Sequence, residues 1–334
     1  MIRVAVVGVG AMGKNHVRVY QEMPEVELVA VADEDAAVGE QVSRMFRVPA
    51  YTNYCEMVAR ERPDAITVAV PTSAHFFVVE ELLKAGCHIL VEKPIAASIE
   101  EAEKLIHLAE VAGRVLMVGH VERYNPAIIE LKQRLDRGEL GRVFQIHARR
   151  LGPFPPRIRD VGVVMDLATH DLDIMRYLTG SDVIRVFAET KRELHISHED
   201  LFAGILRFAN GAVGVLEINW LTPTKIRELY VTGENGMFRV NYLTQDLFFY
   251  ENAETNGSDW TAINLLRGVS EGAVVQFPIN KREPLRVELE AFIACLQGKI
   301  THFANGHDAQ AALALATALV ASSWACQVLE VTTA

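Results

Sequence analysis

Two residues whose side chains suit acid–base chemistry stand out in the sequence, Lys93 and His170. Lys93 follows an apolar run, His88–Val91, and an ammonium group at the end of a buried strand can donate hydrogen bonds to a developing negative charge. His170 follows Asp166 by four residues, and a nearby carboxylate holds an imidazole and stabilises its charged form. These residue types and this spacing are those of a proton-transfer site.

Each of these residues also has a simpler interpretation. The helix predicted over Asp166–Leu178 has one narrow polar stripe at about 100° per residue, and such a stripe can be an ordinary solvated face. Its members are Asp166, His170, Asp173 and Tyr177. Lys93 can be a solvated surface lysine. The D-x-x-x-H spacing could hold a metal ion, but no second histidine or cysteine cluster supports it, so we expect no metal. Asp171 falls on the apolar side of the same helix, where we expect a buried partner.

A nucleotide-binding pattern lies at the N-terminus, between a predicted strand, Ile2–Val7, and a helix that begins near Ala11. The pattern is G-x-G-x-x-G, formed by Gly8, Gly10 and Gly13. The first glycine allows a sharp turn, the second lets a pyrophosphate approach bare backbone, and the third lets the helix pack close to the strand. The free N–H groups of the first turn, at Ala11 and Met12, and the positive end of the helix dipole would face the phosphates. The alternative is a tight strand–helix turn that binds no ligand.

An acidic residue, Asp33, follows the second predicted strand, Leu28–Ala32. Its distance from the glycines is that at which a carboxylate hydrogen-bonds the hydroxyls of an adenosine ribose. Glu34 and Asp35 come next, and no Lys or Arg occurs before Arg44. Because a 2′-phosphate would meet three carboxylates, we expect NAD rather than NADP.

Strands alternate with helices through the first third of the chain. Further strands are predicted over 65–70, 88–91 and 115–118, with helices over 76–85 and 98–113, the second begun by a Ser98/Glu101 capping box. This alternation predicts a doubly wound parallel sheet, whose ligands lie beyond the carboxyl ends of the strands. The residues that follow the strands are therefore candidate contacts: Pro71, Thr72 and His75, then Glu92, Lys93 and Pro94, then Gly119, His120, Arg123, Tyr124, Asn125 and Pro126.

The pattern changes beyond Asn125. A helix over Ala127–Leu135 leads to apolar runs joined by hairpin signals at Asn210-Gly211 and Glu234–Gly236, which predicts an open, mainly antiparallel meander. Residues 253–284 are rich in loop signals. Helices are predicted over 285–296 and 309–328, the second with Asp308 as N-cap. We expect an α/β protein with a nucleotide-binding domain over 1–122 and an α+β domain over 123–334.

Composition excludes several classes of partner. The 334 residues carry a net charge of −10, whereas nucleic acids and anionic membranes need a basic face. The uncharged segment 309–328 is alanine-rich, contains polar residues and lacks a Lys/Arg flank, so we do not expect it to span a membrane. The four cysteines, Cys55, Cys87, Cys295 and Cys326, are scattered and predicted to be buried thiols in a reducing compartment. A strand at the N-terminus leaves no visible signal peptide, so we expect a cytoplasmic protein.

The ordered set of motifs resembles the Gfo/Idh/MocA family of oxidoreductases over nearly the whole chain. The motifs are Gly8–Gly13, Pro71-Thr72 with His75, Glu92-Lys93-Pro94, Arg123-Tyr124-Asn125-Pro126, and Asp166 with His170. The resemblance implies a Rossmann domain, a nicotinamide cofactor, and an open-sheet domain that often packs subunit on subunit, hence a homo-oligomer such as a dimer or tetramer. It also implies that Lys93 is the lysine of the E-K-P motif, that His170 is the catalytic histidine, and that Asp166 is the aspartate that precedes it.

These implications give a full set of expected contacts and a mechanism. The residues expected to contact the cofactor are Gly8, Gly10, Ala11, Met12, Gly13, Asp33, Pro71, Thr72, His75, Glu92, Lys93 and Asn125. For the substrate they are Lys93, Tyr124, Arg157, Arg159, Asp166 and His170. We expect a secondary alcohol to give its hydride to NAD⁺ while His170 takes the hydroxyl proton, Lys93 stabilises the alkoxide and Asp166 orients the substrate and His170.

The substrate is suggested by the run Gly152–Gly180, which is similar to family members that oxidise the C3 hydroxyl of UDP-N-acetylglucosamine. The segment Arg149–Arg159 contains no acid, and prolines stiffen it. Its arginines are Arg149, Arg150, Arg157 and Arg159, and a guanidinium fork suits a pyrophosphate. They could instead pair with carboxylates of a neighbouring subunit. Inositol or another polyol is the alternative substrate. A non-catalytic NAD or ligand sensor is the alternative class, and the presence of both Lys93 and His170 argues against it.

Overall fold

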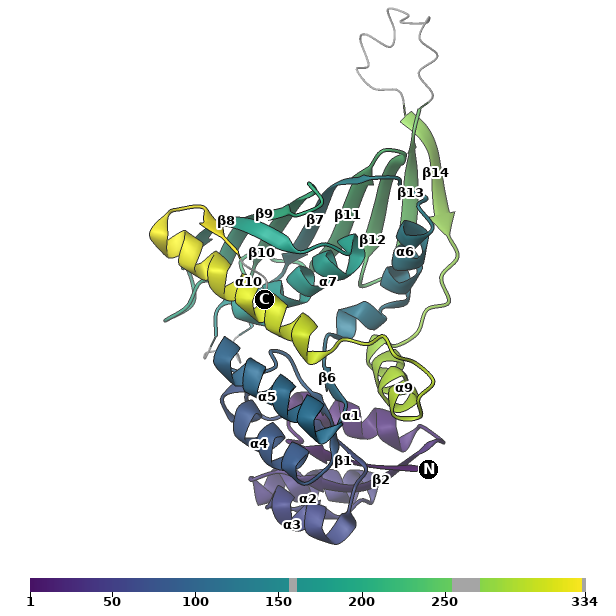
Figure 1. The fold of residues 1–334 in the computed structure, drawn as a ribbon, viewed down its shortest axis with the longest axis vertical. Coiled ribbons are helices and arrows are strands. Elements are labelled where there is room, and N and C mark those ends of the chain that lie inside the picture. The colour runs from purple at the N-terminus through teal and green to yellow at the C-terminus, as the bar shows by residue number, and fades with distance from the viewer. Residues whose placement is uncertain (156–160, 254–270, 332–334) are drawn as a thin grey trace, which may run out of the picture. The chain divides into compact units, whose positions relative to one another are not determined.

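The computed structural model describes residues 1–155, 161–253 and 271–331. The chain forms two compact units (Figure 1). The first comprises Met1–Tyr124 with Glu283–Ala314, and the second comprises Asn125–Arg282 with Leu315–Ala334. From the sequence we expect two continuous domains that meet at residue 122. The structure instead groups the segment 283–314 with the first unit.

The first unit contains a six-stranded parallel sheet in the order β3-β2-β1-β4-β5-β6. The strands are β1 (Ile2–Val7), β2 (Val26–Ala32), β3 (Ala50–Tyr51), β4 (Ala65–Val68), β5 (His88–Val91) and β6 (Leu116–Val118). The predicted doubly wound sheet is confirmed. Its strand order reverses between β1 and β4, which is where ligands bind in such sheets. The two-residue strand β3 is too short to leave a periodic signal, and the sequence did not predict it.

Helices follow the strands, and side chains cap the starts of three of them, at Asp35, Asn53 and Ser98. They are α1 (Ala11–Gln21), α2 (Ala36–Phe46), α3 (Tyr54–Glu61), α4 (Thr72–Lys84), α5 (Ile99–Ala112) and the 3₁₀ turn η1 (Val121–Tyr124). At α5 the predicted Ser98 cap is present, and the Glu101 side chain reaches back to the residue before it. Ser98 Oγ accepts from the Glu101 amide at 3.2 Å, and Glu101 Oε2 accepts from the Ala97 amide at 3.1 Å.

Helix α9 (Pro284–Leu296) completes the core of the first unit. Leu289 and Phe292 are fully buried in one cluster with Val17 and Tyr20 of α1. Ion pairs join Arg18 to Glu283 and Arg286 to Glu22. Apolar burial of this extent stabilises far more than such exposed ion pairs, so the packing of α9 explains why 283–314 belongs with the first unit.

The second unit is built on a nine-stranded sheet in the order β14-β13-β12-β11-β7-β10-β9-β8-β15. Its strands are β7 (Val143–Leu151), β8 (Val183–Lys191), β9 (Leu201–Phe208), β10 (Val213–Asn219), β11 (Ile226–Gly233), β12 (Gly236–Asn241), β13 (Asp246–Asn252), β14 (Glu271–Phe277) and β15 (Leu329–Glu330). Both predicted hairpins are present, and the sheet is mainly antiparallel. One strand departs from the antiparallel pattern, because β7 lies between β10 and β11 and runs parallel to β10.

Helices α6 (Pro126–Asp136), α7 (Thr169–Thr179) and the end of α10 (Gly306–Ala325) bury apolar residues in one cluster with this sheet. The predicted N-cap of α10 is wrong by three residues. Asn305 Oδ1 accepts from the Asp308 amide at 3.0 Å, and Asp308 Oδ2 accepts from the Asn305 amide at 3.2 Å. Asn305 therefore caps the helix, with Asp308 as its reciprocal partner.

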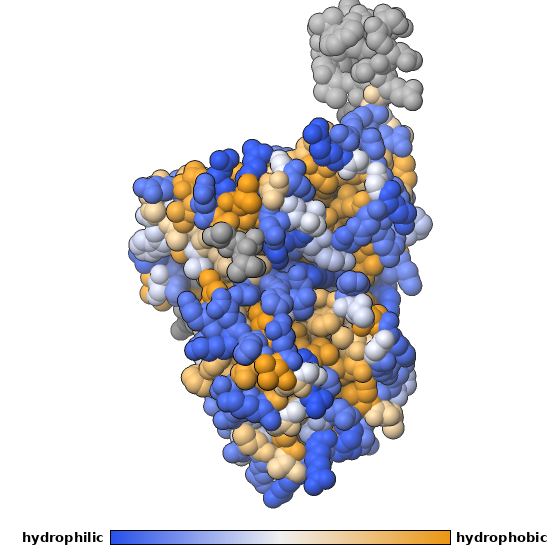
Figure 2. Space-filling model, viewed as in Figure 1, coloured by the Kyte–Doolittle hydropathy of each residue, from blue (hydrophilic) through white to orange (hydrophobic). Residues whose placement is uncertain are grey.

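Apolar side chains are interspersed with polar ones on the face drawn in Figure 2. Among the described residues, no helix combines the length and apolar content needed to cross a bilayer. All four cysteines are free thiols, but the prediction that they are buried is wrong for Cys55 and Cys326, which are exposed.

Candidate active site

A groove of about 940 Å³ lies beside the carboxyl ends of β1, β2 and β4 in the first unit. The glycine turn after β1, the acidic turn after β2 and the start of α4 contribute to its lining. This is the edge of a doubly wound sheet at which a dinucleotide binds.

The three glycines of the N-terminal motif lie in three different environments. Gly8 has φ +81°, and a Cβ there would lie 2.7 Å from the backbone of Ala69. A Cβ on Gly13 would lie 1.9 Å from the carbonyl oxygen of Gly8, so this glycine allows α1 to pack against the turn. A Cβ on Gly10 would meet no atom within 4 Å. The backbone at Gly10 therefore faces open space in the groove, which is the space a pyrophosphate needs.

Asp33 is held in the groove by two backbone hydrogen bonds. Its Oδ2 accepts from the Val9 amide at 2.8 Å and its Oδ1 from the Asp35 amide at 3.0 Å. Asp35 itself caps α2, accepting from the Ala37 amide at 2.9 Å. The described lining includes the carboxylates of Asp33, Glu34 and Glu81 and contains no Lys or Arg. The groove therefore fits an adenosine ribose with free hydroxyls and would repel a 2′-phosphate.

His75, expected to contact the cofactor, is buried and is not among the residues that line the groove. Its Nδ1 lies 2.8 Å from the Pro94 carbonyl oxygen and its Nε2 lies 3.0 Å from that of Val70. Burial lowers the pKa of His75 more than these carbonyls raise it. The residue thus ties the start of α4 to the ends of two strands. Of the two other cofactor contacts predicted nearby, Pro71 lines the groove, whereas Thr72 is the first residue of α4.

Lys93 follows β5 directly, and the residue before it is fixed by a partner that the sequence analysis missed. Glu92 Oε1 lies 2.9 Å from Nε2 of His16, which is fully buried on α1. Burial raises the pKa of the Glu92 carboxyl, but His16 and then Lys93 oppose it, and the net shift is downward. The sequence did contain a clue to this contact. His16 lies three residues after Gly13, on the helix that begins at the glycine turn.

A second residue that was not predicted, Glu288 on α9, is fully buried in the first unit, and neither of its carboxylate oxygens has a hydrogen-bond partner there. Burial, and then the charge of Glu92, raise the pKa of Glu288 well above its usual range. The protonated, uncharged form of this carboxyl is therefore favoured by its surroundings. The sequence carried no signal for this residue, because its spacing is that of an ordinary helix.

Two residues after β6 have structural partners. Tyr124 Oη accepts from the Ala304 amide at 3.3 Å. Asn125 is buried; its Oδ1 accepts from the Ala127 amide at 3.1 Å and its Nδ2 donates to the Tyr242 carbonyl at 3.1 Å. Asn125 is thus the N-cap of α6. The proposed substrate contact of Tyr124 and cofactor contact of Asn125 remain predictions.

Asp166 and His170 lie at the start of the helical segment that the sequence predicted, but its first turn is not an α-helix. Residues Val164–Ala168 form a π turn, and α7 begins only at Thr169. The rotation of 100° per residue therefore does not apply across this junction. Asp173 is fully buried, so the predicted stripe is not a solvated face. Single π turns in α-helices occur frequently at functional sites.

Two of the four expected arginines have partners within the second unit. Arg150 and Asp171 form a buried two-point ion pair, with Nε to Oδ2 at 2.6 Å and Nη2 to Oδ1 at 3.0 Å. This is the buried partner expected for Asp171. Arg149 donates from Nε to Glu217 at 2.7 Å on the neighbouring strand. Both guanidinium groups are therefore engaged inside the sheet domain, and a pyrophosphate contact of the arginine segment stays a prediction. Arg157 and Arg159 lie outside the described residues.

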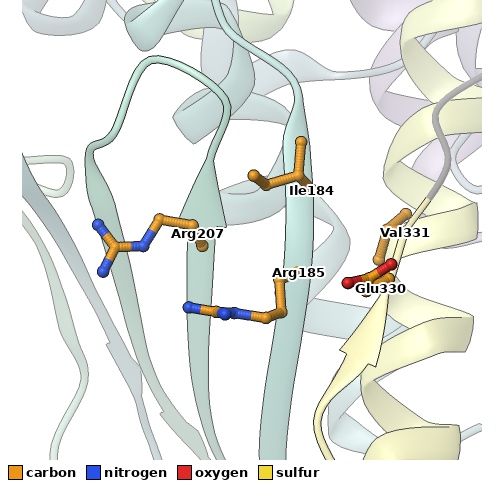
Figure 3. A pocket seen from close by; sticks show the side chains of 5 residues that line it. All are labelled: Ile184, Arg185, Arg207, Glu330 and Val331. Carbon is orange, nitrogen blue, oxygen red and sulfur yellow. The ribbon is translucent and has the colours of Figure 1, made fainter.

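Two further observations concern possible ligand sites. In the part of the chain that the structure describes, no group of three or more His, Cys, Asp or Glu is placed to hold a metal ion. A cavity of about 600 Å³ lies at the edge of the second sheet (Figure 3). It is lined by Ile184, Arg185, Arg207, Glu330 and Val331, and Arg207 also donates to the Gly211 carbonyl at 2.8 Å. None of the predicted site residues lines it.

Comparison with known proteins gives matches over nearly the whole chain. Residues 2–120 match an oxidoreductase family with an NAD-binding Rossmann fold, and residues 128–239 match the GFO/IDH/MocA C-terminal domain. The chain is 30% identical to the UDP-N-acetylglucosamine 3-dehydrogenase of Acidithiobacillus ferrooxidans, covering 94% of this chain and 95% of that protein. A solved structure of that dehydrogenase has a TM-score of 0.86 and covers 97% of this chain and 98% of its own.

A second group of relatives acts on inositols. The chain is 26% identical to the scyllo-inositol 2-dehydrogenase (NAD(+)) of Bacillus subtilis, covering 92% of this chain and 90% of that protein. It is also 26% identical to an inositol 2-dehydrogenase of Rhizobium meliloti, covering 96% of each.

Proposed function

Because the chain belongs to the Gfo/Idh/MocA family of oxidoreductases and has its NAD-binding Rossmann domain, we propose that it oxidises the C3 hydroxyl of a UDP-N-acetylhexosamine such as UDP-N-acetylglucosamine. The observation that carries this proposal is the 30% identity to a UDP-N-acetylglucosamine 3-dehydrogenase over almost the full length of both chains. We also propose a homo-oligomer that works in the cytoplasm.

The groove of the first unit would hold the dinucleotide. The exposed backbone at Gly10 and the start of α1 suit its pyrophosphate, and the tethered carboxylate of Asp33 suits its adenosine ribose. Bound NAD⁺ supplies the hydride acceptor for the reaction. The remaining chemistry is proton transfer and charge stabilisation, which the side chains of the protein must provide.

In this mechanism His170 accepts the proton of the substrate hydroxyl, and Lys93 donates a hydrogen bond to the oxygen as negative charge develops on it. Asp166 accepts a hydrogen bond from the substrate and orients His170. The contact between Glu92 Oε1 and His16 Nε2 at 2.9 Å supports the role of Lys93, because it holds the adjacent residue against α1. The π turn at Asp166 supports a functional role for the start of the second segment.

The nucleotide part of the substrate needs cationic partners. Since Arg149 and Arg150 are paired with Glu217 and Asp171, we assign the pyrophosphate contact to Arg157 and Arg159, which follow in the same sequence segment. An inositol or another polyol is the second candidate substrate, and the full-length similarity to inositol dehydrogenases favours it.

The proposal is tested by measuring NADH formation with UDP-N-acetylglucosamine, free N-acetylglucosamine and myo-inositol. We expect the nucleotide sugar to give the highest kcat/KM. Lys93→Met and His170→Asn are each expected to lower kcat by about 10² or more, with NADH affinity nearly unchanged. Arg157→Ala and Arg159→Ala should raise KM for the nucleotide sugar alone.

The same measurements define failure. Faster turnover of myo-inositol than of the nucleotide sugar would establish the polyol alternative. If His170→Asn keeps full activity across the pH range, the base is another residue, and Tyr124 and Tyr177 are the next to substitute.

A further inference from the structure

A loop of the second unit, Glu193–Asp200, meets the beginning of the segment that carries Asp166. Glu199 makes two hydrogen bonds there. Its side-chain Oε1 accepts from the Val164 amide at 3.1 Å, and its backbone oxygen accepts from the Val163 amide at 2.9 Å. The first amides of a helix lack partners inside it. Here one residue from a distant part of the chain satisfies two of them.

The contact depends on a glycine. A Cβ on Gly162 would lie 2.0–2.2 Å from the carboxylate of Glu199, so only a residue without a side chain admits the carboxylate at this point. A negative charge near the N-terminus of a helix is also favoured by the helix dipole. The missing side chain at Gly162 and the helix dipole therefore both favour the Glu199 carboxylate at this position.

The loop that presents Glu199 is itself braced. The carboxylate of Asp200 is fully buried and accepts from the amides of Glu193, Leu194 and His195 at 2.9, 2.5 and 2.8 Å. The backbone oxygen of Asp200 accepts from the Trp220 amide at 2.9 Å. These bonds fix the two ends of the loop relative to each other and to the end of β10.

His195 braces the middle of the loop. Its Nδ1 accepts from the amides of Ser197 and His198 at 3.1 and 3.0 Å, so the ring hydrogen is on Nε2. The ring stacks on Trp220 with centroids 6.2 Å apart and packs against Phe154 at 5.8 Å. Hydrogen bonds and aromatic packing thus anchor the loop, and this fixes the position of Glu199.

The turn that Glu199 contacts is the π turn Val164–Ala168, which contains Asp166 and continues without a break into α7 with His170. A π turn has poorer intrinsic stability than an α-helical turn, so its register depends on what holds its ends. We propose that Glu199 is a positioning residue: by capping this turn from outside the helix, it sets the orientation of Asp166 and His170. The catalytic part of this inference rests on the proposed function of those two residues.

The test uses Glu199→Ala, Glu199→Gln and Gly162→Ala in the full-length protein, with Glu193→Ala as the matched control. Glu193 is on the same loop, but its side chain pairs with Lys191 at the surface. Backbone hydrogen–deuterium exchange is followed over residues 162–170. We expect exchange at least about tenfold faster in Glu199→Ala and Gly162→Ala, because both remove the carboxylate from the Val164 amide. Glu199→Gln keeps an acceptor oxygen and should restore most of the protection.

Kinetics provide the second measurement. Glu199→Ala should lower kcat about tenfold or more while KM and NADH affinity change little, with partial rescue in Glu199→Gln and none of these effects in Glu193→Ala. Wild-type exchange and kcat in Glu199→Ala would overturn the proposal, and so would equal effects in Glu193→Ala. If Glu199→Ala does not fold, Gly162→Ala carries the same test. Exchange requires no substrate, so it decides the capping role even if the proposed reaction fails.

Discussion

At the scale of single residues, the groove is defined by carboxylates and bare backbone. Asp33 is anchored by the amides of Val9 and Asp35, so its orientation does not depend on a bound ligand. Glu34 lines the same groove but is not anchored in this way. Substitution of Asp33 and of Glu34 can therefore distinguish the hydrogen-bonding role of a carboxylate in the groove from the effect of its charge.

Asp33→Ser is expected to weaken NADH binding about tenfold, because it removes a hydrogen-bond acceptor for the ribose. It should also reduce the difference in affinity between NADH and NADPH, because it removes a negative charge. Glu34→Gln should change NADPH affinity only, because it removes charge without a ribose contact. Fluorescence titration of both dinucleotides measures these effects. Equal affinities of the unmodified protein for NADH and NADPH would refute the argument from charge.

At the scale of secondary-structure elements, one buried ion pair joins the strand before the predicted pyrophosphate segment to the helix of His170. Arg150 belongs to β7 and Asp171 to α7, and the two side chains are 5% and 2% exposed. The guanidinium also lies 5.4 Å from the ring centre of Tyr242. The pair aligns α7 on the sheet through two parallel hydrogen bonds.

Asp171→Asn is expected to lower the free energy of unfolding by about 3–5 kcal/mol, because it leaves the Arg150 charge buried without a counter-charge. The control is Asp182→Asn. Asp182 is 51% exposed and pairs with Arg176 at the surface, so its loss should cost less than about 1 kcal/mol. Urea denaturation of the two variants gives the comparison. Similar, small losses in both would show that the buried pair does not anchor α7.

At the scale of the whole molecule, the nucleotide-binding unit is discontinuous in sequence. The segment 283–314 supplies α9 to its core, and the Ala304 carbonyl accepts from the Val118 amide of β6 at 2.9 Å. Leu285, Leu289, Phe292 and Ile293 are all buried in the cluster shared with α1. A fragment that ends at residue 124 would expose the surface they cover.

We therefore expect residues 1–124 alone to lack a cooperative thermal transition. The same residues joined to 283–314 by a flexible linker should fold and bind NADH, since the four side chains contribute on the order of 5–10 kcal/mol by burial. Circular dichroism and NADH fluorescence measure both properties. Cooperative unfolding of 1–124 at the same temperature as the linked protein would contradict the assignment of α9 to this unit.

The features that the sequence determined by itself are those that depend on neighbours along the chain. The strands β1 and β5, the glycine turn, the Ser98 cap and the Asn210-Gly211 hairpin each follow from a local pattern, because strand periodicity, φ angles and caps are settled within a few residues. The family resemblance rested on such local motifs taken in order.

The tertiary structure alone decided how distant residues are paired and which turns are distorted. Asp171 needed a partner 21 residues away, and the π turn at Asp166 is capped by Glu199, 35 residues from the amide it accepts. The packing of α9 on α1 joins residues more than 260 positions apart. Spacing along a chain carries no record of such contacts, since they arise only when the backbone folds and buried polar groups must find partners.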